Sequence, residues 1–152
     1  MILQERTHPE AAAMKIHVNR IPEEGLKDHT VYDPSELDME RWDIRLPKPF
    51  EVDAMITKAD EELLVNVDIR CSLRMTCSRC LEEFDTVVTP EALLSYTVHP
   101  TDVVDITEDV RQEIILAYPM IPVCQAGCKG LCGECGQNLN HGPCRHHPAG
   151  QG

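Results

Sequence analysis

The stretch VNVDIRCSLRMTC, residues 65–77, alternates strictly between apolar and polar side chains. Its apolar residues occupy the odd positions, and its polar residues occupy the even positions from Asn66 to Thr76. Because successive side chains of a strand point to opposite faces of the sheet, this pattern predicts a long, half-buried strand. Cys71 continues the apolar face, so we interpret it as a packed thiol, whereas Cys77 ends the strand and leads into a turn.

Neighbouring segments predict the rest of a sheet. Residues 50–57 alternate in the same way, and the polar stretch 58–62 joins them to the long strand as an antiparallel hairpin. Residues 84–88 and 92–98 read as two further strands. Pro90 separates them, because proline cannot donate a hydrogen bond to a sheet interior.

One main helix follows these strands. The sequence Asp-Ile-Thr-Glu, residues 105–108, has the form of a capping box, with Asp105 in the capping position. It predicts a helix over 106–117 that stops near Tyr118, since Pro119 comes next. A single helical turn is expected near residues 35–37, after Pro34.

Composition and charge narrow the class of protein. The chain has 152 residues, 42% of them hydrophobic but only 4% aromatic, so its core is aliphatic. No run approaches the roughly 20 apolar residues of a membrane helix, and the N-terminal sequence MILQER lacks the order of a signal peptide. We therefore expect a cytoplasmic protein with reduced thiols. A net charge of −12 argues against general coating of nucleic acid, which needs clustered Lys and Arg.

The acidic side chains gather in the middle of the chain. Residues 81–113 contain nine acidic side chains and a single basic one, Arg111. Such a segment is either a solvated acidic face or a surface for a basic partner. Both interpretations stay open at the level of the sequence.

Seven of the eight cysteines form close-spaced clusters. In a cytoplasmic protein, such spacing favours metal binding over disulfides, and neither C-x2-C precedes the helix that a redox motif requires. We predict structural zinc, as one or two ions, because thiolates at this spacing can surround a tetrahedral ion. No motif of a catalytic zinc site or of another enzyme is recognisable, so we predict that the protein is not an enzyme. The clustered cysteines are Cys77, Cys80, Cys124, Cys128, Cys132, Cys135 and Cys144.

Seven thiols fall one short of two complete tetrahedral sites. His141, His146 and His147 flank Cys144, and His146 is the preferred eighth ligand. We favour one site of Cys77, Cys80, Cys124 and Cys128, and a second of Cys132, Cys135, Cys144 and His146. A mixed site that joins Cys77 and Cys80 with Cys132 and Cys135 remains an alternative.

These observations predict an α+β fold: an antiparallel β-sheet with one main helix and a C-terminal zinc-stabilised extension. Residues 14–122 form the core domain, and residues 123–147 form the Cys-rich zinc-binding segment, which has too few apolar residues for a core of its own. Residues 1–13 and 148–152 are expected to be a disordered N-terminal extension and a disordered tail. Met14, which begins a plausible strand over 14–18, is an alternative start of the protein.

Three stretches in this order resemble the YceD family, the bacterial large ribosomal RNA subunit accumulation proteins. They are CSRCLE at 77–82, EIILAYPMIPVC at 113–124 and CKGLCGECGQNLN at 128–140. Many members of that family end this region in C-x-C, where the present chain has Cys144-Arg145-His146. A histidine in place of a cysteine is compatible with a zinc ligand and strengthens the choice of His146.

The resemblance implies a non-enzymatic factor in large ribosomal subunit biogenesis that supports 23S rRNA accumulation. Its partners would be the large-subunit precursor, through rRNA or a basic ribosomal protein. No membrane and no small-molecule substrate are expected. Arg70 and Arg74 lie on one face of the long strand and, with Arg79, are candidates for RNA contact. A zinc-ribbon adaptor in transcription or metal handling is the alternative function.

Overall fold

The computed structural model describes residues 5–8 and 14–146, and the fold is built around its longest strand, β6 (Glu62–Thr76). The predicted alternation is confirmed. Leu63, Val65 and every second residue up to Met75 are buried, with at most 2% of each side chain exposed. Each such aliphatic side chain stabilises the fold by about 1.5–3 kcal/mol when fully buried.

β6 is the strand with the most partners in a seven-stranded sheet. The predicted hairpin partner is β5 (Phe50–Ala59), which pairs antiparallel with β6 through a two-residue turn at Asp60 and Glu61. On its other side, β6 pairs first with β8 (Glu91–Thr97) and then with β7 (Glu83–Val88). The sheet continues from β5 to β3 (Leu26–Tyr32) and from there to β1 (Glu5–His8), which pairs parallel with β3. β4 (Ile44–Arg45) pairs with the far end of β6.

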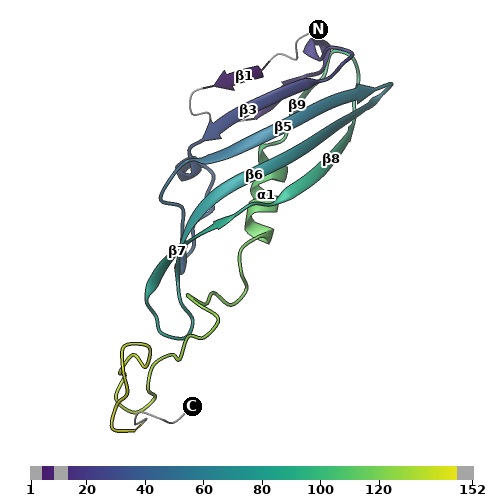
Figure 1. Ribbon diagram of the computed structural model, residues 1–152. Helices are drawn as coiled ribbons and strands as arrows, with labels where there is room; N and C mark the ends of the chain where they lie inside the picture. The colour runs from purple at the N-terminus through teal and green to yellow at the C-terminus, as the bar shows by residue number, and fades with distance from the viewer. Residues whose placement is uncertain (1–4, 9–13, 147–152) are drawn as a thin grey trace.

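The helix covers one face of this sheet. α1 (Thr107–Leu116) lies behind β6 and β8 in Figure 1 and buries Val110 and Ile114 completely. Asp105 Oδ1 accepts the N–H of Thr107 at 2.9 Å and so satisfies one free donor of the first turn. The helix ends before Pro119, as predicted. A second, two-stranded sheet pairs β2 (Lys15–His17) with β9 (Val103–Asp105) beside α1.

Several elements were not predicted. β3 was missed because the polar residues Asp28 and Thr30 stand on its inward-facing side, between Leu26 and Tyr32. His29 lies on the outward-facing side of β3. β1, β4 and β9 have four, two and three residues, too few for a period to be recognised. Two 3-10 turns occur, η1 (Val18–Arg20) and η2 (Pro34–Glu36), and η2 coincides with the turn expected near 35–37.

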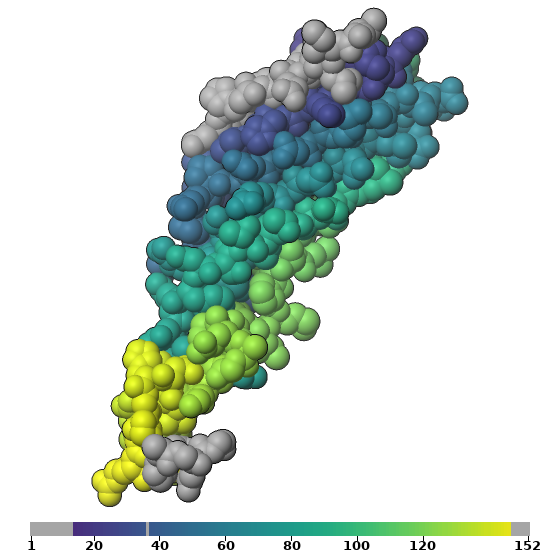
Figure 2. Space-filling view, viewed as in Figure 1, coloured from purple at the N-terminus to yellow at the C-terminus, as the bar shows by residue number. Residues whose placement is uncertain are grey.

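The molecule is elongated, with the sheet at one end and the Cys-rich segment at the other (Figure 2). The observed architecture is therefore the predicted one, an antiparallel sheet with one main helix and a C-terminal Cys-rich extension. Of the predicted N-terminal extension, residues 5–8 form β1, while residues 1–4 and 9–13 lie outside the described residues, as does the predicted tail 148–152. Within the described part of the chain, no helix is long and apolar enough to cross a membrane.

Candidate metal centres

The first C-x2-C forms a tight turn at the end of β6. The N–H of Cys77 donates to Glu82 O at 2.9 Å, and the N–H of Leu81 donates to Cys77 O at 3.0 Å. The N–H of Arg79 points at Cys77 Sγ, 3.4 Å away. Because β6 is rigid and buried, this turn holds its two thiols in a fixed position at the tip of the sheet.

The second C-x2-C repeats the same turn. The N–H of Cys132 donates to Gln137 O at 2.8 Å, and the N–H of Gly136 donates to Cys132 O at 2.9 Å. The N–H of Glu134 points at Cys132 Sγ, again at 3.4 Å. Two segments more than 50 residues apart thus adopt one geometry, in which backbone N–H groups converge on the first sulfur. Donors placed in this way stabilise a thiolate.

Cys124 and Cys128 reach the first turn through the segment that follows α1. Pro122 O accepts hydrogen bonds from both the N–H and the hydroxyl of Ser78, each at 2.8 Å. This contact aligns the segment with the turn, and the N–H of Cys124 lies 3.4 Å from Cys77 Sγ. The result is a group of four thiols, here called the first group: Cys77, Cys80, Cys124 and Cys128, whose sulfurs all lie within 4.8 Å of one another.

The sulfur separations of the first group fit a metal ion and exclude disulfides. Cys77 Sγ lies 3.8 Å from Cys128 Sγ, and Cys80 Sγ lies 3.8 Å from Cys124 Sγ. Four sulfurs placed about 2.3 Å from a central ion at tetrahedral angles would be about 3.8 Å apart. A disulfide would bring two sulfurs to about 2.05 Å. The four cysteines are free thiols, and the two separations of 3.8 Å match those of a tetrahedral site.

The second group consists of Cys132, Cys135, Cys144 and His146, whose ligand atoms also lie within 4.8 Å of one another. Cys132 Sγ is 3.8 Å from His146 Nδ1. The second group is more open to solvent than the first: Cys135 and His146 are exposed, whereas three of the four cysteines in the first group are buried. Both groups contain the residues that the preferred sequence interpretation assigned to them, and the mixed arrangement does not occur.

The electrostatics of the first group favour a bound cation. Burial opposes ionisation of Cys77, but the N–H groups of Cys80, Cys124 and Arg79 outweigh it and lower the pKa of this thiol to about 6. For Cys124, burial and the neighbouring thiols of the group raise the pKa to about 12. Ionising one thiol therefore makes the next one harder to ionise. A cation at the centre would offset the repulsion between thiolates, so that all four sulfurs could be ionised.

The second group has the same character. Hydrogen bonds from the N–H groups of Cys135 and Glu134 lower the pKa of Cys132 to about 6. The pKa of Cys135 is raised, in part by the thiols of Cys132 and Cys144. The two groups can therefore each hold one metal ion with four protein ligands.

Cys71 and His141 lie outside both groups. Cys71 is fully buried among core side chains, and burial raises the pKa of its thiol to about 12, as expected for a packed residue. His141 Nε2 contacts Glu82 Oε1 at 3.0 Å and takes no part in either group. His147 lies outside the described residues. Sequence reasoning missed Asn140, whose side chain contacts the first group, because only the folded segment brings it there.

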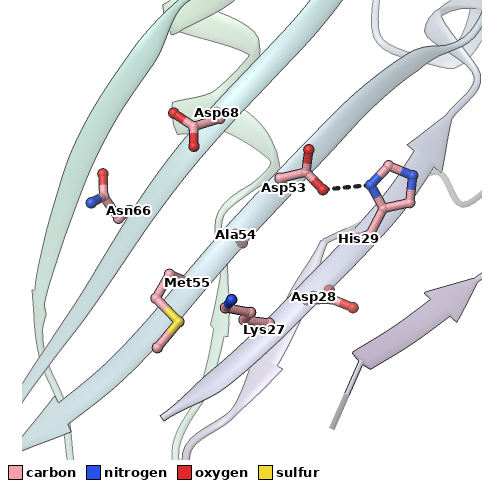
Figure 3. Close-up of a pocket in the computed structure, with 8 residues that line it drawn as sticks. All are labelled: Lys27, Asp28, His29, Asp53, Ala54, Met55, Asn66 and Asp68. Atoms are coloured by element: carbon pink, nitrogen blue, oxygen red, sulfur yellow. Dashed lines mark hydrogen bonds and ion pairs between the residues drawn. The ribbon is translucent and has the colours of Figure 1, made fainter. Parts of the chain in front are cut away.

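A second polar feature lies on the face of the sheet opposite to α1. A groove of about 420 Å³ lies there, and Figure 3 draws the side chains of β3, β5 and β6 that line it. Asp53 stands directly across from Asp68 on β6, and Asp68 directly across from Glu91 on β8. At the other end of this acidic row, His29 Nδ1 forms a hydrogen bond with Asp53 Oδ1 (Figure 3).

Comparison with known proteins finds a family match in the C-terminal part of the chain. Residues 89–151 match the family model described as large ribosomal RNA subunit accumulation protein YceD. The similarity to the YceD family is thus found in this stretch of the chain. It contains α1, the segment that brings Cys124 and Cys128 to the first group, and every ligand of the second group. The resemblance that the cysteine motifs suggested is confirmed over this part of the chain.

The curated relatives are mycobacterial. Uncharacterized proteins of Mycobacterium bovis and Mycobacterium tuberculosis are each 30% identical over 134 residues, which cover 78% of this chain and 65% of theirs. An uncharacterized protein of Mycobacterium leprae is 31% identical over 107 residues, covering 60% of this chain and 49% of its own. The chain thus spans 65% or less of the length of these relatives. No solved structure matches the chain.

Proposed function

We propose that this protein is a factor in large ribosomal subunit biogenesis that supports the accumulation of 23S rRNA. The observation that carries this proposal is the match of residues 89–151 to the YceD family, whose description names the accumulation of large-subunit ribosomal RNA. The match includes the C-terminal segment that completes both candidate metal centres. The family match and most ligands of the two groups therefore lie in the same part of the chain.

The proposed metal is zinc, with one ion in each group. Thiolate-rich, four-coordinate sites are those that zinc occupies in structural roles, and the sulfur separation of 3.8 Å fits its bond length. Each group supplies four protein ligands and so leaves no position for a substrate. We therefore assign the ions a structural role and propose that the protein acts by binding, without catalysing a reaction. The cytoplasm, where thiols stay reduced, is the proposed compartment.

The proposed partners are components of the large-subunit precursor. The acidic row of Asp53, Asp68 and Glu91 on the open sheet face has the charge to attract a basic ribosomal protein. Nearer to the metal centres, Arg45 on β4 stands directly across from Arg74 on β6; both are exposed, and Arg74 forms an ion pair with Asp85, so Arg45 carries the positive charge there. This end of the same face could contact rRNA phosphates. The precursor is thus expected to meet the open face of the sheet and not the face covered by α1.

Deletion of the gene tests the proposal. Cells without the protein should show a lower ratio of 23S to 16S rRNA, and a tagged wild-type protein should co-sediment with large-subunit precursors. Complementation with Cys128→Ala should fail, whereas Cys71→Ala, which leaves both groups intact, should restore the ratio. A normal ratio together with sedimentation away from precursors would overturn the proposal and would favour the zinc-ribbon adaptor in transcription or metal handling.

A further inference from the structure

One side chain connects the two candidate metal centres. Asn140 belongs to the loop between Cys135 and Cys144, two ligands of the second group, but its amide contacts the first group. Asn140 Nδ2 donates to Cys128 Sγ at 3.3 Å, and Asn140 Oδ1 accepts the N–H of Lys129 at 2.8 Å. The amide thus binds both the sulfur of a first-group ligand and the backbone that follows that ligand.

The backbone around Asn140 is paired with the loop that runs from Cys128 to Cys132. The N–H of Leu139 donates to Gly130 O at 2.9 Å, and Asn138 forms a β-bridge with Leu131. Next to them, His141 Nε2 contacts Glu82 Oε1, just after the first C-x2-C turn. Segment 138–141 therefore lies against the loop that carries Cys128.

The same segment depends on the second group for its position. Cys135 precedes it and Cys144 follows it, so an ion bound to both would close the loop that contains Asn140. Closing a loop of this size removes much of its conformational freedom. Without such an ion, the loop must hold Asn140 in place through hydrogen bonds alone, and these are individually weak.

We propose that Asn140 is a positioning residue that couples metal binding at the two groups. An ion at the second group orders segment 138–141, which places the Asn140 amide N–H on Cys128 Sγ and raises the affinity of the first group for metal. Since coupling between sites is reciprocal, an ion at the first group raises the affinity of the second group equally. This inference rests on the proposed metal binding by both groups. A donor to a metal ligand typically changes metal affinity 10–100-fold.

Titration of the metal-free, reduced protein with Co²⁺ tests the coupling. Co²⁺ reports each group separately, because four-sulfur and three-sulfur–one-nitrogen sites absorb at different visible wavelengths. As a single substitution, with all eight ligands present, Asn140→Ala should lower the Co²⁺ affinity of the first group about tenfold. Asn140→Asp should lower it further, because it keeps the acceptor for Lys129 but places a carboxylate beside the sulfur. Gln125→Ala, which removes an exposed amide from the loop between Cys124 and Cys128, should leave the affinity unchanged.

A double-mutant cycle separates coupling from a local effect. Cys144→Ala disables the second group and should by itself weaken Co²⁺ binding to the first group about tenfold, and Asn140→Ala should then add nothing. Equal losses from Asn140→Ala with and without Cys144 would overturn the coupling, since the hydrogen bond would then act without help from the second group. No loss from Asn140→Ala in the intact chain would also overturn it. Absence of cobalt–thiolate absorption in the wild-type chain would overturn metal binding itself, and the coupling with it.

Discussion

Leu81 and Gly136 occupy equivalent positions in the two C-x2-C turns, and both have a left-handed backbone, with φ of +63° and +76°. Each is the residue after the second cysteine, and its N–H closes the turn onto the first cysteine. Glycine adopts this conformation without steric strain, whereas in a leucine it costs about 1–2 kcal/mol of conformational free energy. The first turn accepts this strain because β6 and the first group of thiols fix the backbone around it.

Substitutions at these two positions should change the free energy of unfolding in opposite directions. Gly136→Ala should lower the stability of the metal-loaded protein by about 1 kcal/mol. Open space surrounds the position, so the cost comes from the left-handed backbone conformation alone. Leu81→Gly should raise it by about 0.5 kcal/mol, the relief of strain less the entropy that glycine adds to the unfolded chain. Urea unfolding at fixed metal concentration measures both. Gly133→Ala, in the same turn without a positive φ, is the control and should raise stability by about 0.5 kcal/mol, because it only removes entropy from the unfolded chain.

Cys71 should behave as a core residue. Cys71→Ala should lower the free energy of unfolding by about 1 kcal/mol through the small cavity that it leaves, and the bound metal should stay the same. Thermal unfolding and elemental analysis of one sample test both statements. A fall in metal content would show that Cys71 is a ligand and that the assignment of the two groups is wrong.

Asp53 and Asp68 face each other on adjacent strands, which costs stability because like charges directly opposite repel. Asp68→Asn should therefore stabilise the protein by about 0.5 kcal/mol, and the gain should shrink at high salt. Glu23→Gln makes the same change of charge on an exposed loop and should have little effect. An equal gain from both variants would point to net charge and not to this pair.

The hydrogen bond between His29 and Asp53 predicts a pH dependence. The side chain of Asp53 raises the pKa of His29 above its usual 6.5. A raised pKa in the folded state means that the pair stabilises the protein fully below pH 6.5 and ceases to do so as the pH rises through the folded-state value. NMR titration of the imidazole should show the raised pKa, and Asp53→Asn should bring it back towards 6.5. An unchanged pKa in that variant would contradict the role of Asp53.

Much of this structure follows from local patterns in the sequence. The alternation from Val65 to Met75 predicts β6 and the burial of Cys71, and the separate alternation over residues 50–57 predicts β5, because each depends on side-chain periodicity. Cysteine spacing and the position of His146, two residues after Cys144, predict the composition of both groups. β3 escaped prediction because two residues of its inward-facing side, Asp28 and Thr30, are polar.

Other features depend on contacts that no local pattern contains. Leucine has no preference for the left-handed conformation, so the strain at Leu81 appears only in the folded turn. The Asn140 contact joins residues of two different loops, and its meaning depends on where Cys128 lies. The like-charged Asp53 and Asp68 become neighbours only once the register of β5 and β6 is fixed.

Metal content, measured by elemental analysis on protein purified without added chelator, tests the central claim most directly. The intact chain should carry two zinc ions, Cys128→Ala should lose the ion of the first group, and Cys135→Ala should lose the ion of the second group. Because the groups are coupled, each variant should also bind its remaining ion more weakly. An intact chain that contains no zinc, or one whose content is unchanged by both substitutions, would contradict the account.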